Sequence, residues 1–241
     1  MSRQNHSPIS SKMLGGQKFF WARPTRPVVD IFRKPVDNFE RLSEAAKTRN
    51  RQTQTTLAGP AFQVLGQENT WSLIQLADGA FGWLPNSSLK RVRNLNYWAK
   101  IKPAPREKLV EIKASGKAKV RKILAEFADI PYLWGGTTRS GVDCSAFSQR
   151  LCWQLGKILL PRNSREQKKC GRSVQSTKIK DLDLLFFVHS KTDRHHVAVY
   201  WDGEVWHFCL DKQGLTSESL ESIKKRYNHV ATRRIFKFKH A

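Results

Sequence analysis

The segment Tyr132–Trp153, YLWGGTTRSGVDCSAFSQRLCW, restricts the possible folds more than any other part of the 241-residue chain. Its glycines break regular structure, and a stretch with helical periodicity follows directly. Gly156 is the expected C-cap of that helix. The pattern predicts a loop that places Cys144 in the first turn of an amphipathic helix whose apolar stripe contains Phe147, Leu151, Cys152 and Leu155.

A cysteine at a helix N-terminus can act as a nucleophile. The pKa of a free thiol, about 8.5, falls beside the exposed N–H groups of a helix start, because they favour the thiolate. The same N–H groups can donate hydrogen bonds to the oxyanion of a tetrahedral intermediate. The alternative is that Cys144 is a small core residue, as free cysteines commonly are.

A hairpin further along the chain supplies two histidines. The sequence HVAVYWDGEVWHF alternates apolar and polar residues around Asp202-Gly203, a dipeptide typical of a two-residue type I′ turn. This turn predicts that Ala198 faces His207 and that His196 faces Cys209. Side chains of facing residues lie on one side of a hairpin, so His196 and His207 are expected to be diagonal neighbours.

Two imidazoles on one face can complete a thiol-based site. One can act as general base toward Cys144 while the other holds its tautomer through the second ring nitrogen. His195 must point to the opposite face, and we take it as a surface residue.

The remaining sequence divides into four parts. Residues 1–24 are polar and lack periodicity, which predicts a flexible tail. Residues 25–95 predict a small β-barrel of about five strands, and the proline- and lysine-containing residues 96–115 predict a linker. Within the barrel we expect strands at Phe62–Gln67, Trp71–Gly79 and Ala80–Pro85.

Residues 116–241 predict an α+β domain. A helix with apolar residues at 120, 123, 124 and 127 precedes the Cys144 helix, and strands follow at Asp181–Val188 and in the hairpin. A further short helix is expected in SESLESIKKRY, and a closing strand in ATRRIFKFK.

The chain carries 43 basic and 20 acidic residues, a formal net charge of +23. Such a charge favours anionic partners, and cell-wall polymers are the candidates that we retain. The basic clusters match no RNA-binding signature, so we expect no specific nucleic acid. The four cysteines contain no CxxC pair, so neither a zinc site nor another cofactor is expected.

The sequence also gives an indication of where in the cell the protein is located. It shows no apolar run typical of a signal peptide and none long enough to cross a membrane. We therefore expect a cytoplasmic protein, with a secreted or cell-envelope protein as the alternative.

Four motifs together resemble the NlpC/P60 family of papain-like cysteine peptidases across about residues 115–240: YLWGGTTRSGVDCSAF, LPRNSREQ, DLLFF and HHVAVYWDGEVWHF. The preceding RQTQTTLAGPAFQVLG and DGAFGWLP are similar to a bacterial SH3 domain. The resemblance implies a papain-like fold of helices on an antiparallel sheet, preceded by an SH3-like barrel.

The resemblance also implies a reaction. It makes the protein a hydrolase of γ-D-glutamyl-diamino acid bonds in peptidoglycan stem peptides, acting through a thioester. Cys144 matches the nucleophile, His196 the base and His207 the residue that orients the base. The resemblance places the substrate-binding residues at Tyr132, Asp143, Ser145 and Asn163.

Two departures from the family concern specificity. Asn163 stands where family members that require a free N-terminal amine carry aspartate, and Ala80 stands where their SH3 domain supplies a tyrosine. Two alternative functions stay open: another thiol-dependent amidase or acyltransferase on the same scaffold, and a non-catalytic binder of anionic polymers.

Overall fold

The computed structural model describes residues 19–36, 38–93, 98, 101–113 and 116–239. It forms two compact units: residues 1–101 with 134–138, and residues 102–133 with 139–241. Among the described residues, no helix is long and apolar enough to span a membrane.

The first unit contains a seven-stranded antiparallel sheet in the order β3-β2-β6-β5-β4-β1-β7. Its core contains Ile31, Phe62, Ile74 and Leu84, all fully buried. The elements of this unit are β1 (Phe20–Pro24), β2 (Val28–Phe32), α1 (Glu44–Asn50), β3 (Arg51–Thr56), β4 (Phe62–Glu68), β5 (Trp71–Gln75), β6 (Phe81–Pro85), β7 (Leu89–Val92) and β10 (Thr137–Thr138).

The first unit differs from the sequence prediction in three ways. The described sheet has seven strands in an open order, in place of a closed barrel of about five. Residues 20–24, which we assigned to the tail, form β1 and pair with both β4 and β7, whereas residues 1–18 lie outside the described residues. The strand expected at Trp71–Gly79 ends at Gln75, because residues 76–80 form a turn with Gly79 at φ 81°.

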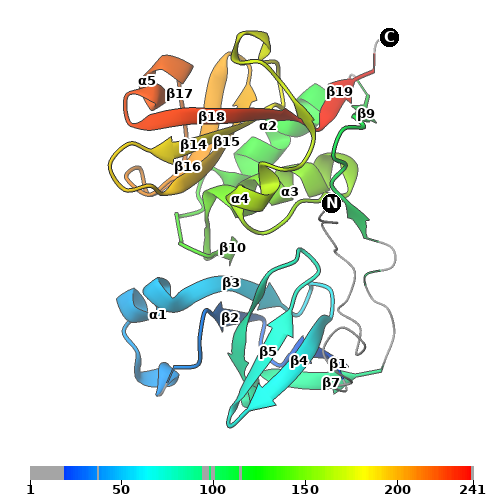
Figure 1. The fold of residues 1–241 in the computed structure, drawn as a ribbon, viewed down its shortest axis with the longest axis vertical. Coiled ribbons are helices and arrows are strands. Elements are labelled where there is room, and N and C mark those ends of the chain that lie inside the picture. The colour runs from blue at the N-terminus through cyan, green and yellow to red at the C-terminus, as the bar shows by residue number, and fades with distance from the viewer. Residues whose placement is uncertain (1–18, 37, 94–97, 99–100, 114–115, 240–241) are drawn as a thin grey trace. The chain divides into compact units, whose positions relative to one another are not determined.

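The second unit is an α+β arrangement built on a six-stranded antiparallel sheet, β13-β18-β14-β15-β16-β17 (Figure 1). Two short strands lie in the predicted linker, β8 (Lys102–Pro103) and β9 (Val110–Ile112). The other elements are α2 (Gly116–Phe127), β11 (Gly141–Val142), α3 (Cys144–Gly156), β12 (Ile158–Leu159), α4 (Ser164–Gln167), β13 (Arg172–Ser173), β14 (Leu184–His189), β15 (His195–Trp201), β16 (Glu204–Cys209), β17 (Gly214–Glu218), α5 (Leu220–Lys224), β18 (Tyr227–Arg234) and β19 (Phe236–Phe238).

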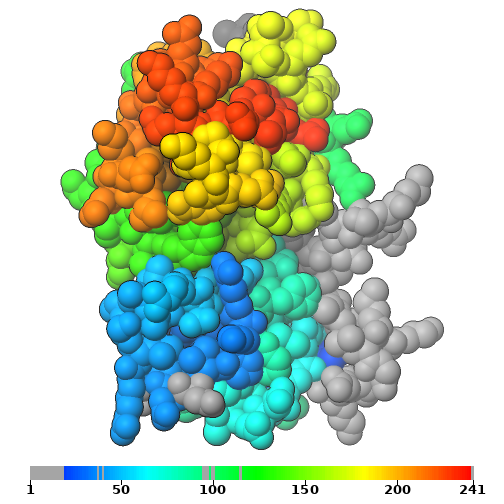
Figure 2. Space-filling view, turned by 60° about the vertical axis from the view of Figure 1, so that its left-hand side comes forward, coloured from blue at the N-terminus to red at the C-terminus, as the bar shows by residue number. Residues whose placement is uncertain are grey.

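The two faces of this sheet have different partners. Helices α2 and α3 pack on one face through Phe127 and Phe147, which meet Val197 and Val199 in the main core. On the other face, Ile223 of α5 joins a smaller cluster. The turn after β14 rests on the residues before β18, because the Ser190 hydroxyl donates to the carbonyl of Arg226 at 3.0 Å, and Figure 2 shows these segments side by side.

The end of α3 corrects one local prediction. Gly156 is the last helical residue, and Lys157 after it adopts the left-handed conformation with φ 55°. Glycine is needed at 156 for a different reason. A Cβ there would lie 2.7 Å from the ring of Phe236, so the close approach of β19 requires a residue without a side chain.

Candidate active site

Cys144 is the first residue of α3, as the glycine-rich loop predicted. Asp143 caps the helix, because its Oδ1 accepts a hydrogen bond from the backbone N–H of Ala146 at 2.8 Å. Cys144 is buried, with 9% of its surface exposed. The thiol therefore lies at the positive end of a helix and is shielded from bulk water.

A buried ion pair fixes this helix start. Arg162 donates to both oxygens of Asp143, through Nη1 at 3.0 Å and Nη2 at 2.7 Å. Ser145 joins them, since its hydroxyl donates to Asp143 Oδ1 at 2.9 Å and accepts from Arg162 Nη1 at 2.7 Å. The side chains of Asp143 and Ser145, which the resemblance gave to substrate, thus bond within the protein.

The two predicted histidines meet. His196 Nε2 lies 2.8 Å from His207 Nδ1, and both rings are buried. The other nitrogen of His207, Nε2, lies 3.0 Å from Glu218 Oε1. Three side chains from β15, β16 and β17 therefore form one continuous chain of hydrogen bonds.

This chain determines where the protons are. The pKa of Glu218 is lowered, since hydrogen bonds from Arg226, Ser222 and His207 outweigh its burial, so its carboxylate only accepts. His207 must then donate from Nε2, which leaves its Nδ1 as an acceptor for the Nε2–H of His196. Nδ1 of His196 is consequently unprotonated, the state that a general base requires.

Both imidazoles are neutral in the resting protein. Burial lowers the pKa of His196 well below its ordinary value, and the neighbouring His207 and Arg226 lower it further. Burial also lowers the pKa of His207, against the opposing effect of Glu218. A neutral His196 is free to accept a proton.

Glu218 was missed by sequence reasoning. We placed it in a helix, SESLESIKKRY, whereas the helix α5 begins only at Leu220 and Glu218 ends β17. The pairing of β17 with β16 sets His207 opposite Thr216, so Glu218 lies two residues further along on the same face. Alternation along TSE was the signal that could have found it.

The two strands of the hairpin pair only near the turn, and the described pairing ends before His196 and His207. Its turn forms as predicted, with Trp201 opposite Glu204 and both turn residues at positive φ. In the described strands, however, the register ends at Val199–Trp206, so the predicted pairs of His207 and Cys209 do not form. The N–H of Val197 hydrogen-bonds the sulfur of Cys144 instead.

Two contacts bring the thiol to the histidine chain. Val197, which donates to Cys144, directly follows His196. The ring of Tyr227 stacks on His196 with centroids 5.1 Å apart. Burial raises the pKa of Tyr227 to about 12, and Cys144 is close enough to add a small part of this rise. The structure thus brings together Cys144, His196 and His207.

The pKa of Cys144 corrects the expectation of an activated thiolate. Burial, and then the charge of Asp143, raise the pKa of the thiol to about 12. The N–H groups of Val197 and Ser145 and the charge of Arg162 oppose this shift without reversing it. The resting pair is therefore a neutral thiol and a neutral imidazole, because desolvation outweighs the helix N-terminus.

The two other predicted site residues differ in position. Tyr132 is half-buried, and burial together with the charge of Cys144 raises the pKa of its hydroxyl, which places it near the thiol. Asn163 is exposed at the start of α4 and makes no side-chain capping bond. It follows the buried Arg162 directly.

Fold and site together define the class of thiol–imidazole proteins in which a helix-start cysteine faces histidines of an antiparallel sheet. The family model that matches residues 129–235 is the NlpC/P60 family. A relative described as "Probable endopeptidase NlpC" from Escherichia coli K12 is 30% identical over 106 residues, covering 44% of this chain and 69% of the relative. The chain belongs to the NlpC/P60 family, as its motifs predicted.

Two further relatives have more specific names. "Murein DD-endopeptidase MepS/Murein LD-carboxypeptidase" from E. coli K12 is 32% identical over 116 residues, 47% of this chain and 61% of that protein. "Gamma-D-glutamyl-L-lysine dipeptidyl-peptidase" from Bacillus cereus is 39% identical over 84 residues, 34% of this chain and 25% of that protein. The chain thus spans less than two thirds of the length of both relatives.

Proposed function

We propose that the protein is a cysteine peptidase that cleaves peptidoglycan stem peptides. The observation that carries this proposal is the chain His196–His207–Glu218, which leaves an unprotonated Nδ1 on the histidine next to Val197, the residue that donates to the Cys144 sulfur. The named relatives support the substrate class.

The proposed reaction starts from the neutral pair. As the sulfur of Cys144 attacks the scissile carbonyl carbon, its proton moves to Nδ1 of His196. The resulting imidazolium gives that proton to the departing amine, which leaves a thioester. His196 then takes a proton from water, the hydroxide attacks the thioester, and the acid product and the free thiol are released.

The remaining site residues have supporting roles in this proposal. His207 and Glu218 hold the tautomer of His196, and Asp143, Ser145 and Arg162 hold the start of α3. Tyr132 and the exposed Asn163 are the residues that we propose to contact substrate.

For the bond, we propose the γ-D-glutamyl-diamino acid linkage, because the four motifs resemble enzymes of that specificity. Asn163 offers an amide and no charge, so we expect the enzyme to accept peptides with a blocked N-terminus. A charge-assisted hydrogen bond to a free amine would otherwise add about 1.5–3 kcal/mol of selectivity.

We also propose that the first unit, which consists mainly of β-strands, is an SH3-like domain. Its successive antiparallel strands β4, β5 and β6 and the sequence DGAFGWLP support this assignment. A crystal structure in which the seven strands do not curve into two packed layers would contradict it.

The enzymatic proposal is tested by incubating the protein with a defined mixture of free and N-acetylated muropeptides, with mass spectrometry of the products. We expect cleavage after γ-D-glutamate in both groups. Cys144→Ala should abolish cleavage without lowering Tm, whereas Cys152→Ala, a buried thiol of the same helix, should retain it.

Two outcomes would count against the proposal. Cleavage by Cys144→Ala would remove this thiol from the mechanism. Cleavage at a D,D-peptide bond alone would keep the peptidase and overturn the γ-D-glutamyl specificity.

A further inference from the structure

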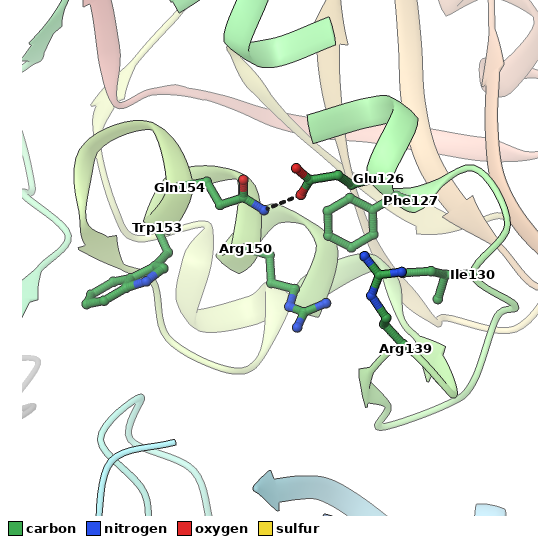
Figure 3. Close-up of a pocket in the computed structure, with 7 residues that line it drawn as sticks. All are labelled: Glu126, Phe127, Ile130, Arg139, Arg150, Trp153 and Gln154. Carbon is green, nitrogen blue, oxygen red and sulfur yellow. Dashed lines mark hydrogen bonds between the residues drawn. The ribbon is translucent and has the colours of Figure 1, made fainter. Parts of the chain in front are cut away.

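A concave site lies between α2 and the C-terminal half of α3. Its volume is about 230 Å³. Since a water molecule occupies roughly 30 Å³ of liquid, the pocket can hold a group the size of several waters. The lining residues are Glu126, Phe127, Ile130, Arg139, Arg150, Trp153 and Gln154 (Figure 3).

Two like charges meet in this pocket. Figure 3 shows the guanidinium groups of Arg139 and Arg150 turned toward one another below the ring of Phe127. They are close enough for the charge of Arg139 to lower the pKa of Arg150, after the larger effect of burial, and the charge of Glu126 opposes this shift. In the described part of the chain, neither arginine forms an ion pair.

Glu126 carries the one carboxylate among the residues that line the pocket, and it forms no ion pair with Arg139 or Arg150 in the described part of the chain. Glu126 is held by the amide of Gln154, which donates to its Oε2 at 3.3 Å, on the side of the pocket away from Arg139. Two other arginines of this unit, the buried Arg162 and the half-buried Arg234, each form an ion pair with a carboxylate.

The walls add apolar and aromatic surface. Arg150 lies over the ring of Phe127, with its Cζ 5.7 Å from the ring centroid. Trp153 is 39% exposed at the edge of the pocket, and Lys157 lies 5.4 Å from the centroid of its indole ring. The pocket therefore combines a pair of forked donors with an exposed aromatic face.

This pocket is separate from the candidate active site. At 100° per residue, Trp153 projects from the side of α3 opposite Cys144, and Arg150 lies about 9 Å along the helix axis from it. Cys144 faces β15, whereas the pocket faces α2.

We infer that the pocket formed by Arg139, Arg150 and Trp153 binds an oxyanion, a phosphate or carboxylate group carried on a ring. Paired guanidinium groups match the two oxygens of such an anion, and binding removes the repulsion between them. The ring of the ligand would lie on the exposed indole of Trp153.

Thermal unfolding of the full chain tests this inference. Inorganic phosphate, phenyl phosphate and benzoate are compared with sodium chloride at equal ionic strength. We expect phosphate to raise Tm above the chloride value and phenyl phosphate to raise it further, by on the order of 3 °C. An effect of benzoate without one of the phosphates would identify the carboxylate as the preferred group.

Substitutions of single arginines test whether the rise in Tm depends on this pocket. Arg139→Gln and Arg150→Gln should each remove the excess rise in Tm. Arg121→Gln should keep it, because this exposed arginine of α2 lies elsewhere and contacts Asp202 at 3.8 Å. An equal rise in all three variants, an equal loss in all three, or no excess over chloride with any ligand would overturn the inference.

Discussion

The arginines at the two ends of α3 differ in whether they have a carboxylate partner. At its N-terminus, Arg162 is 2% exposed and bonds both oxygens of Asp143 and the hydroxyl of Ser145. In its C-terminal half, Arg150 faces a second arginine and forms no ion pair with a described residue. An arginine thus stabilises the fold at the N-terminus of α3, whereas the arginine in its C-terminal half has donor groups that a ligand could bind.

The difference shows how to separate structural charges from binding charges. A charge whose partners are all internal holds the fold, and removing it leaves the partner buried and unpaired. Two like charges held close together without a partner repel one another, and binding of an anion would relieve that repulsion. Measured stability and measured binding should therefore respond oppositely at the two ends.

The largest effect is expected from breaking the buried pair. Arg162→Met should lower the free energy of unfolding by about 3–5 kcal/mol, because Asp143 would remain buried without its cation. Arg150→Met is the matched change at the other end, and we expect it to alter stability by less than about 1 kcal/mol. Urea unfolding measures both, and equal losses would refute the comparison.

A smaller effect is expected at Glu218, which we assign as a positioning residue. In Glu218→Gln the new amide can donate to His207 Nε2, which would reverse the hydrogen bonds and place a proton on Nδ1 of His196. We expect kcat to fall about 10- to 100-fold with little change in KM.

The control for this variant is Glu221→Gln in the first turn of α5, which should leave kcat unchanged. A structural defect in Glu218→Gln would instead change KM and Tm together with kcat. An unchanged kcat would remove Glu218 from the chain that orients His196.

The smallest effect is the pH dependence of stability. The pKa of His196 is lowered in the folded protein, so the unfolded chain binds more protons below pH 6.5 and stability must fall as the solution is acidified. We expect His196 to contribute a loss of about 1.4 kcal/mol for each pH unit below 6.5.

Urea unfolding between pH 5 and 7.5 measures this slope. His196→Gln should make the slope shallower, and His189→Gln, a change on the neighbouring strand, serves as the control. If the slope is the same in the wild type and in His196→Gln, another group determines the acid sensitivity.

Local parts of the fold and site could be predicted from the sequence. The position of Cys144 at a helix start follows from glycines and helical periodicity within a few residues of one another. The two-residue turn Asp202-Gly203 predicted that the side chains of His196 and His207 lie on the same face of the hairpin. Strand number in the first unit was underestimated, because β1 lies in residues that we assigned to the tail and the four residues of β7 are too few to show alternation.

By itself, then, the sequence determined which residues start the helix, close the hairpin and share its inner face, since backbone stereochemistry acts over neighbouring positions. Only the tertiary structure shows which groups bind these residues. Arg162 pairs with Asp143, Glu218 accepts a hydrogen bond from His207, and the N–H of Val197 donates to the thiol. It also decided the protonation of Cys144. Desolvation and long-range hydrogen bonds depend on segments distant in the chain, and no local pattern encodes them.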